Sequence, residues 1–158
     1  MEKVRLVVIG FGNMGTGHVK SVAEGRVPGM ELGAICDSAP ARCEAARQAY
    51  PEIPVFGDAQ ELYRSGLCDA VIIATPHYFH PPLAIEAFRH GLHVITEKPA
   101  GVYTKQVKEM NAAAAQSHRK FGIMYNQRTN PVYQKLREMV KKGELGHINM
   151  ITWIITDW

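Results

Sequence analysis

Long apolar runs and blocks of like charge are both missing from this chain of 158 residues. No apolar stretch approaches the ~20 residues that a membrane-spanning helix needs. The 18 basic and 15 acidic residues leave a net charge of only +3, and nowhere do five like charges follow one another. These absences argue against a membrane protein and against a dedicated nucleic-acid surface. We therefore expect no membrane and no nucleic acid among its partners.

Cysteine is also scarce. Cys36, Cys43 and Cys68 are odd in number, widely spaced and without a Cys-x-x-Cys pair, so neither a disulfide framework nor a zinc site is indicated. Reduced thiols are typical of a cytoplasmic protein, which is the location we expect. His77 and His80 have no acidic partner nearby in the sequence, and we expect no metal site there.

Short apolar runs rich in branched residues recur along the chain. They are unbroken rather than alternating, which is typical of strands that are covered on both faces. The runs are Val4–Ile9, Leu32–Cys36, Ala70–Ala74, His93–Thr96 and Phe121–Tyr125. Helix-like stretches separate them, and this alternation predicts an α/β fold with a doubly wound, mostly parallel sheet.

Three of the intervening stretches carry helix signals. One runs from Pro82 to Arg89 and is stopped by Gly91. A second would begin at Thr104 as its N-cap, and a third would open at Asn130 and stop at Gly143. The residues of the third helix that we expect to face inward are Leu136, Met139 and Val140.

The end of the chain, "GHINMITWIITDW", is β-prone and carries no helix signal. One strand of that length cannot satisfy its edges alone, so it pairs with another chain or the sequence is cut short. We favour the second explanation. The expected domains are then residues 1–126, and residues 127–158 as a connecting helix and the opening strand of a second α/β domain whose remainder is absent.

A glycine pattern follows the first strand directly. "VVIGFGNMGTGH" holds Gly10, Gly12 and Gly15 in the spacing G-x-G-x-x-G, between a strand and a helix. The first glycine permits a tight turn, the second lets a pyrophosphate approach the backbone, and the third lets the helix pack close to the strand. The helix N-terminus would present the amides of Asn13 and Met14 to the phosphates. This context predicts a dinucleotide site.

An acidic residue ends the second strand. Asp37 stands at about the distance from the glycines at which a carboxylate meets the ribose hydroxyls of an adenosine. It could instead be a turn residue before Ser38 and Pro40. Because a carboxylate repels a 2′-phosphate and Arg42 is five residues away in the sequence, the pattern favours NAD over NADP.

Polar residues follow the later strands. Thr75 and Pro76 come where ligands bind in such sheets, outside the carboxyl ends of the strands. His80 fits a helix-start residue that packs and forms hydrogen bonds. Glu97 and Lys98 leave an apolar strand directly, and the residues alone leave two interpretations equally open: a reactive site, or an ion pair between Glu97 and a base.

These motifs together resemble the Gfo/Idh/MocA oxidoreductase family, named for glucose–fructose oxidoreductase, inositol dehydrogenase and a rhizopine-catabolism protein. The segments that carry the resemblance are "GFGNMGTGH", "CD", "VIIATPHYFHPPLAIEAFRHGLHVITEKPAGV" and "YNQRTNP", and they cover almost the whole chain. The resemblance implies an N-terminal Rossmann domain. It also implies a C-terminal α/β domain whose open sheet lines the substrate site and often forms the oligomer interface.

The resemblance also implies roles for individual residues. Those that would bind the cofactor are Gly10, Gly12, Asn13, Met14, Gly15, Asp37, Thr75, Pro76, His80, Glu97, Lys98, Pro99, Asn126 and Arg128. Among them, Pro99 would follow a cis peptide, and Asn126 and Arg128 would end the sixth strand. His77 departs from the asparagine often found after that Thr-Pro pair, which leaves its role open.

The activity that the resemblance implies is hydride transfer between nicotinamide, NAD in preference to NADP, and a sugar, cyclitol or related polyol. Lys98 would be the catalytic residue of this chain, because an ammonium can hydrogen-bond the substrate oxygen and stabilise developing negative charge. An acid–histidine pair from the second domain would complete the site, and the full protein would form a homo-oligomer. The alternative that stays open is a non-catalytic dinucleotide-binding module. A methyltransferase that binds S-adenosylmethionine is a third interpretation, against which the spacing of Gly15 and the segment Glu97-Lys98-Pro99 argue.

Overall fold

The computed structural model describes residues 2–154 and divides the chain into two compact units. The first unit is Met1–Met124 and the second is Tyr125–Trp158. The sequence analysis places the boundary slightly later, between residues 126 and 127. Each unit is described here by itself.

The first unit is built on a six-stranded sheet with the order β3-β2-β1-β4-β5-β6, in which every pairing is parallel. The strands are β1 (Val4–Ile9), β2 (Met30–Cys36), β3 (Val55–Phe56), β4 (Ala70–Ile73), β5 (His93–Thr96) and β6 (Phe121–Ile123). The predicted parallel α/β sheet is confirmed. The sequence analysis missed only β3, because two residues are too short a run to give a periodic signal.

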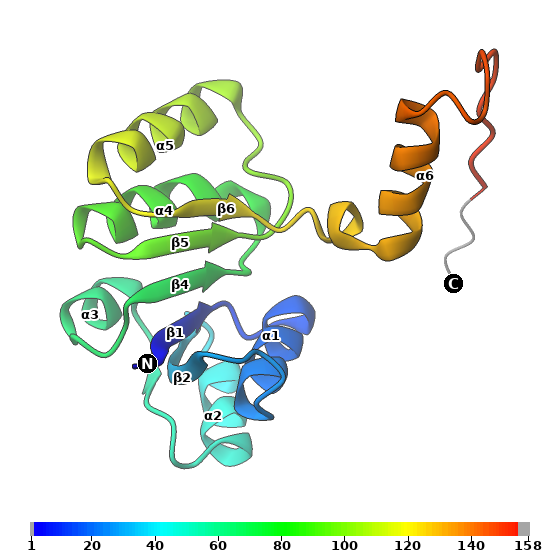
Figure 1. Ribbon diagram of the computed structural model, residues 1–158. Helices are drawn as coiled ribbons and strands as arrows, with labels where there is room; N and C mark the ends of the chain where they lie inside the picture. Colours follow the sequence, from blue (N-terminus) through cyan, green and yellow to red (C-terminus); the bar gives the residue numbers. More distant parts are fainter. Residues whose placement is uncertain (1, 155–158) are drawn as a thin grey trace. The chain divides into compact units, whose positions relative to one another are not determined.

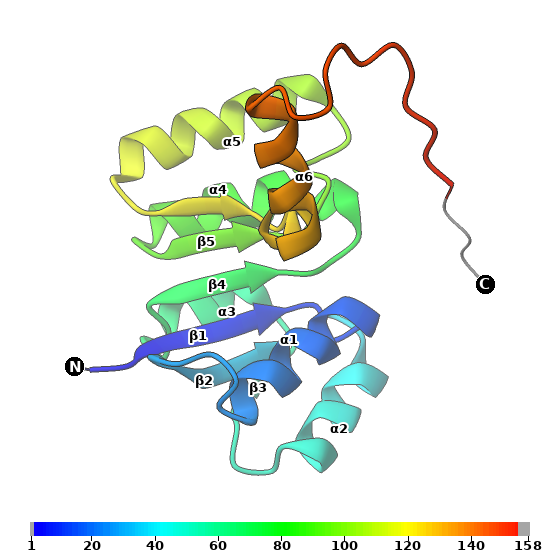
Figure 2. The same ribbon diagram turned by 45° about the vertical axis from the view of Figure 1, so that its right-hand side comes forward.

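Helices connect the strands and cover both faces of the sheet, as Figures 1 and 2 show. They are α1 (Asn13–Ala23), α2 (Pro40–Ala49), α3 (Ala59–Arg64), η1 (His77–Phe79), α4 (His80–Arg89) and α5 (Thr104–Ser117). The predicted N-cap at Thr104 is wrong, because the extended residue before the helix is Tyr103 and Thr104 is already helical. The model contains no helix, within the residues it describes, that is long and apolar enough to cross a membrane.

Alternate residues of the strands point to opposite faces of the sheet and form a layer of hydrophobic core on each face. Val7, Ile9 and Ile73 belong to one buried cluster together with residues of α3, α4 and α5, such as Leu62, Phe88 and Met110. On the other face, Val8 packs with Val19 of α1 and Ala46 of α2, and Leu6 and Ile72 pack with Val22. Burial on both faces explains why the strand sequences are continuously apolar.

The register of the central strands fixes where a ligand can bind. Ile9, the last residue of β1, stands opposite Cys36 at the end of β2 and opposite Ile73 at the end of β4. The chain order reverses between β1 and β4, and ligands of open α/β sheets bind in the crevice at such a point. The glycine loop, Asp37 and the Thr75–Pro76 segment all leave the sheet at this edge.

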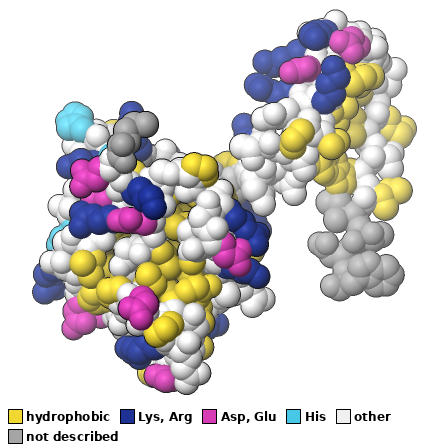
Figure 3. Space-filling view, turned by 60° about the horizontal axis from the view of Figure 1, so that its bottom comes forward, with side chains coloured by type: hydrophobic (Ala, Val, Ile, Leu, Met, Phe, Trp, Pro, Cys, Tyr) yellow, Lys and Arg dark blue, Asp and Glu magenta, His cyan; other side chains and the backbone are white. Residues whose placement is uncertain are grey.

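The second unit holds η2 (Asn126–Thr129) and α6 (Pro131–Lys141). The predicted helix start is confirmed, because Asn130 accepts a hydrogen bond from the amide of Val132 at 2.9 Å, and Gly143 follows the helix with φ of 71°. The predicted inward face is wrong for Leu136 and Val140, which are 44% and 45% exposed. Figure 3 shows apolar side chains on the surface of this unit.

The predicted final strand is not formed in the part that can be described. Residues 146–154 contain no strand, and residues 155–158 lie outside the described structure. A strand needs a neighbour for its main-chain N–H and C=O groups, and no described segment pairs with this one. Trp153 instead stacks on Tyr133 of α6, with ring centroids 5.3 Å apart.

Candidate functional site

The turn between β1 and α1 can be made only by glycine at two positions. Gly10 has φ of 99°, and a Cβ on it would lie 2.7 Å from the carbonyl oxygen of Ala74. A Cβ on Gly15 would lie 1.7 Å from the carbonyl oxygen of Gly10. The first turn of α1 is therefore pressed against the end of β1, in agreement with the packing predicted from the glycine spacing.

The N-terminus of α1 is open to an anion. Gly12 is its N-cap, in an extended conformation, and no acidic residue occupies the first turn. The amide of Thr16 already bonds to the carbonyl of Gly12 at 2.9 Å, whereas the amides of Asn13 and Met14 precede the first helical hydrogen bonds. Such amides, together with the helix dipole, bind phosphate groups.

Asp37 holds the glycine loop and the start of α2 together. Its carboxylate accepts hydrogen bonds from the amides of Phe11 and Ala39, at 2.7 Å and 2.8 Å, and the residue is buried. The bond to Ala39, two residues on, is a turn contact of the kind that the alternative interpretation predicts. The same side chain lines a pocket, so the turn contact leaves room for the predicted contact with a ribose.

Arg42 lies closer to Asp37 than its place in the sequence suggests. The first turn of α2 brings its guanidinium nitrogen Nη1 to 3.5 Å from Oδ2 of Asp37. The guanidinium also lies 3.6 Å from where a Cβ on Gly12 would be. The sequence analysis treated this arginine as remote, and the fold places it beside the carboxylate that would select the cofactor.

A cavity of about 500 Å³ lies beside Gly10, Asp37 and Arg42. It is lined by Ile9, Gly10, Cys36, Asp37, Ser38, Ala39, Arg42, Gly57, Asp58, Ala59, Thr75, Pro76, Phe79 and Leu83. It lies at the switch point of the sheet, where a dinucleotide is expected. The buried hydroxyl of Thr75 has no hydrogen-bond partner in the structure, and a bound ligand would supply one. The bare Gly12, the free amides, Asp37 and this hydroxyl fit a dinucleotide.

His80 joins two loops of the site. It is fully buried at the start of α4, and its ring nitrogens lie 2.8 Å from the carbonyl oxygens of Pro99 and Thr75. A neutral ring can donate to one of these carbonyls and a protonated ring to both. The expectation that His80 packs and hydrogen-bonds at a helix start is confirmed. The ring therefore acts on the site by holding the two loops together. The ring of His77 contacts it edge-on, with centroids 5.7 Å apart.

Glu97 is, with Asp37, one of two buried carboxylates near the site. Its Oε1 lies 2.8 Å from Nε2 of His18 in α1, and its Oε2 accepts a hydrogen bond from the amide of Lys98 at 3.1 Å. The predicted partner of Glu97 was an unspecified base, and the structure identifies it as His18. His18 lies within the glycine motif, but 79 residues separate it from Glu97, so the sequence alone does not pair the two.

Lys98 lies between Glu97, which contacts His18, and Pro99, which contacts His80. Lys98 is exposed, and in the described part of the chain it forms no ion pair. The peptide between Lys98 and Pro99 is cis, as the resemblance implied. The ammonium of Lys98 is therefore not neutralised by its neighbour Glu97, which is paired with His18.

The buried thiol and phenol of the core are not acid–base groups. Burial raises the pKa of Cys36 to about 12, with smaller contributions from Cys43 and Asp37, and burial likewise raises the pKa of Tyr63. Cys43 donates its thiol hydrogen bond to the carbonyl of Asp37. The thiol of Cys36 and the phenol of Tyr63 therefore stay protonated at neutral pH and serve packing.

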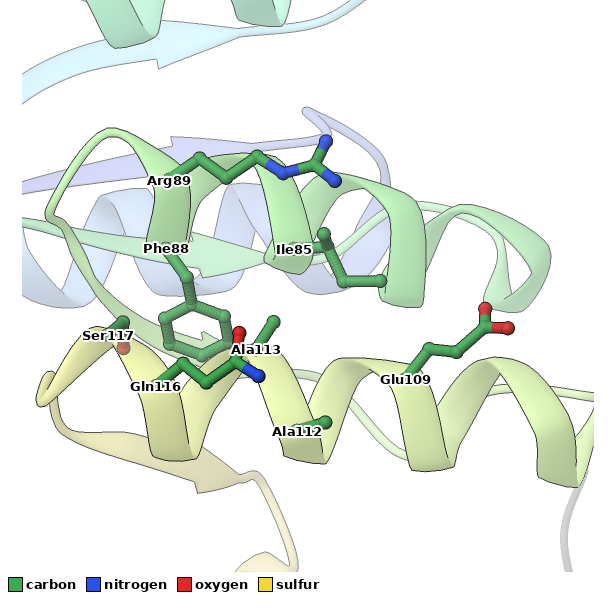
Figure 4. Close-up of a pocket in the computed structure, with 8 residues that line it drawn as sticks. All are labelled: Ile85, Phe88, Arg89, Glu109, Ala112, Ala113, Gln116 and Ser117. Carbon is green, nitrogen blue, oxygen red and sulfur yellow. The ribbon is translucent and has the colours of Figure 1, made fainter.

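A second groove, of about 480 Å³, lies between α4 and α5 (Figure 4). Ile85 and Phe88 of α4 point toward Ala113 and Gln116 of α5 in this view, and none of the predicted site residues lines it. The groove is on the outer side of the helix layer, away from the carboxyl edge of the sheet. Its shape therefore reflects the packing of two helices, and we do not assign it to the site.

Two predicted residues belong to the second unit. The expectation that Asn126 and Arg128 end the sixth strand is wrong, because β6 ends at Ile123 and both residues lie in η2; their contact with the cofactor stays a prediction. Arg128 lies over the ring of Tyr125, 5.7 Å from its centroid. Residues 2–154 contain no cluster of three or more side chains suited to a metal ion.

Comparison with known proteins places this geometry in a family. The chain is 29% identical over 151 residues to the inositol 2-dehydrogenase of Arthrobacter sp. (strain FB24), covering 95% of this chain and 44% of that protein. Its structure matches the scyllo-inositol dehydrogenase of Lactobacillus casei, solved with NAD(H) and scyllo-inositol, with a TM-score of 0.85 and 25% identity over 92% of this chain and 43% of the other.

A third relative is the WlbA dehydrogenase of Bordetella pertussis, solved in complex with NADH and UDP-GlcNAcA, with a TM-score of 0.85 and 28% identity over 92% of this chain and 44% of the other. The chain thus spans less than half the length of the relatives it matches. The model of the oxidoreductase family with an NAD-binding Rossmann fold matches residues 4–125. The chain belongs to this family, the Gfo/Idh/MocA oxidoreductases.

Proposed function

We propose that this chain is the cofactor-binding half of an NAD-dependent oxidoreductase that acts on a cyclitol, a sugar or a related polyol. One observation carries the proposal: Gly10, Asp37 and Thr75 line one cavity at the switch point of the sheet, and β5, the strand that leads to Lys98, lies beside β4 and ends at the same carboxyl edge. Two of the relatives named above are inositol dehydrogenases, and the third is a dehydrogenase that binds NADH and UDP-GlcNAcA, which supports the substrate class.

The residues of this chain would hold NAD mainly through main-chain groups. The amides of Asn13 and Met14 would bind the diphosphate at the start of α1, where Gly12 leaves the approach free. Asp37 would accept hydrogen bonds from the adenosine ribose. Thr75, with its unpartnered hydroxyl, would bind nearer the nicotinamide ribose. The remaining residues of the first unit proposed for this end of the site are Pro76, His80, Glu97 and Pro99. The cofactor contacts of Asn126 and Arg128, in the second unit, stay predictions that rest on the family resemblance.

The chemistry of this chain would centre on Lys98. NAD, when bound, supplies the acceptor for the hydride that leaves a carbinol carbon. The carbinol oxygen gives up a proton in the same oxidation, and the ammonium of Lys98 would hydrogen-bond that oxygen and stabilise the charge that develops on it. The absence of an ion pair to Glu97 supports this role, because it leaves the ammonium available to a substrate.

The rest of the catalytic apparatus is proposed to lie in a second domain, including an acid–histidine pair and a sheet through which copies of the protein associate. The length of the relatives supports a second domain. We also propose a cytoplasmic location, on the ground that Cys36, Cys43 and Cys68 are all free thiols.

Titration with NADH tests the proposal directly. We expect this chain to bind NADH with a saturable change in nicotinamide fluorescence, and to bind S-adenosylmethionine much more weakly. Absence of any saturable change up to millimolar NADH would overturn the assignment. If a longer form with its second domain bound NADH but turned over no inositol, sugar or other polyol, the non-catalytic dinucleotide-binding module would be favoured instead.

A further inference from the structure

We propose that His18 is a positioning residue of this site: through Glu97 it fixes the main chain of Lys98 relative to the helix whose first turn would bind the cofactor phosphates. The inference rests on the function proposed above and adds to it a residue that makes no contact with cofactor or substrate. It is carried by the contacts of one buried carboxylate.

Glu97 is a buried charge that depends on its two partners. Its side chain is only 6% exposed, and burying a carboxylate is costly unless hydrogen bonds compensate for lost water. The bond from the amide of Lys98 is local, since it comes from the next residue along the chain. The bond to Nε2 of His18 is therefore the side-chain contact, among those in the described structure, that ties Glu97 to another element.

The other end of this link is equally well fixed. His18 lies one helical turn after Met14 in α1, on the same face. The start of α1 cannot shift, because Gly15 packs directly against the carbonyl of Gly10. The His18–Glu97 pair thus connects a rigid phosphate-binding turn to the point where the chain leaves β5.

The loop that carries Lys98 is held from both sides. His18 holds it at Glu97, and His80 holds it at the carbonyl of Pro99 while bonding to Thr75 with its other ring nitrogen. Lys98 stands between these two fixed points and is itself exposed. Because a displacement of about 1 Å can cost about 100-fold in rate, such bracing is what a reacting side chain requires.

A general loss of structure would weaken the binding of every part of the cofactor equally. A loss of positioning at residues 97–99 would weaken the binding of the nicotinamide part alone. ADP would contact the glycine loop and the Asp37 pocket but has no nicotinamide. NADH would contact both of these and the loop at residues 97–99. The proposal therefore predicts that a substitution at His18 weakens the binding of NADH and leaves the binding of ADP nearly unchanged.

The test compares three variants of this chain. His18→Leu keeps the volume but removes the donor, and we expect the Kd of NADH to rise about tenfold, equivalent to about 1.4 kcal/mol, while the Kd of ADP changes less than about twofold, within the scatter of additive effects. His18→Gln keeps an N–H group near the position of Nε2 and should restore NADH binding. His90→Leu is the matched control, because His90 pairs with Glu86 at 3.5 Å on α4, outside the site.

A second readout needs no nucleotide. Hydrogen exchange of the Lys98 amide, followed by NMR, should speed up in His18→Leu and not in His18→Gln or His90→Leu. Unchanged exchange in His18→Leu, equal weakening of NADH and ADP, or no rescue by glutamine would each overturn the positioning role. Failure of the unsubstituted chain to bind NADH would instead overturn the proposed function, and is seen separately.

Discussion

The two halves of the sheet contribute to the site by different means. In the half formed by β1, β2 and β3, the groups at the carboxyl edge are mainly main-chain amides, set by Gly10 and Gly15 and tied down by Asp37. In the half formed by β4, β5 and β6, the groups are side chains on two loops. His80 joins these loops to each other, and His18 joins one of them to α1. Main-chain groups suit what all dinucleotides share, whereas side chains suit what differs between reactions.

The difference also shows in how each half tolerates change. The turn at Gly10 and Gly15 is tightly packed, so a methyl group added at either position collides with the backbone. A loop held by side chains can lose one contact and still exist, but its geometry relaxes. Substitutions in the first half should therefore act on folding and binding together, and those in the second half should act on chemistry more than on stability.

The largest effect is expected for Gly15→Ala. Its Cβ would lie 1.7 Å from the carbonyl oxygen of Gly10, which forces α1 away from β1. We expect the free energy of unfolding to fall by about 3 kcal/mol or more, with NADH binding lost. Urea denaturation and NADH titration measure the two effects.

Gly17→Ala is the control in the same helix. A Cβ at Gly17 meets no atom within 4 Å, and alanine is the better helix former by about 0.5–1 kcal/mol. Stability should hold or rise. Equal losses in the two variants would show that close packing at Gly15 is not what shapes the phosphate-binding turn.

Lys98→Ala tests the other half. In a form of the protein that carries the proposed second domain, kcat should fall about 100-fold or more, because the stabilised substrate oxygen loses its partner. The Kd of NADH and the midpoint of urea denaturation should change little, since the loop keeps its anchors at Glu97 and Pro99. Lys108→Ala, at an exposed lysine of α5, is the control. Full turnover in Lys98→Ala would return this lysine to a structural role.

Much of this architecture could be predicted from the sequence, because its signals are local. Unbroken apolar runs and the glycine pattern indicated a doubly wound parallel sheet and a tightly packed turn at its first strand, and both are confirmed as structure. Phosphate binding by this turn stays a prediction. β3 escaped because it has two residues, and α3 was not recognised although Asp58 caps it by accepting hydrogen bonds from the amides of Gln60 and Glu61. An Asp before a short helical run was the signal available.

The contacts that shape the site could not be predicted, because they join distant segments. The bond between His18 and Glu97 spans 79 residues, and spacing alone does not pair them. The approach of Arg42 to Asp37 depends on the direction in which α2 starts. The expectation that Leu136 and Val140 of α6 face inward was wrong, because the spacing of apolar residues indicates an apolar face but does not say what covers it, and both residues are exposed in the described structure.

Asp37→Ser should change the preference between NAD and NADP. We expect this effect to be smaller than the loss of turnover in Lys98→Ala. The carboxylate now pairs with Arg42 at 3.5 Å and would repel a 2′-phosphate. Without it, the guanidinium is free to bind that phosphate, so the ratio of NADP to NAD affinity should rise by about tenfold or more. Titrations of both cofactors measure this ratio.

The arginine supplies the control for that change. Arg42→Ala alone should leave NAD preferred, and adding it to Asp37→Ser should abolish the gain in NADP affinity. A gain that persists without Arg42 would mean that removal of the negative charge, rather than a new phosphate contact, sets the preference.

The smallest effect is expected at the opposite edge of the sheet, where the strands begin. Arg5 of β1 bonds to Asp69 just before β4, at 2.7 Å between Nη2 and Oδ1, and these contacts lower the pKa of the Asp69 carboxyl. A carboxyl with a lowered pKa contributes stability that is present above its unfolded pKa and is lost as the pH falls through its folded pKa. Both side chains are largely exposed, so solvent screens the pair and its contribution is small.

Asp69→Asn should therefore lower Tm slightly at pH 7 and make no difference in acid, below the pKa of the folded carboxyl. NADH binding should be unchanged at every pH at which the chain is folded, because the pair lies at the amino ends of the strands and the site at their carboxyl ends. Thermal unfolding across a pH series, with NADH titrations alongside, measures both. A change in NADH affinity would mean that the amino ends of the strands are energetically coupled to the site at their carboxyl ends.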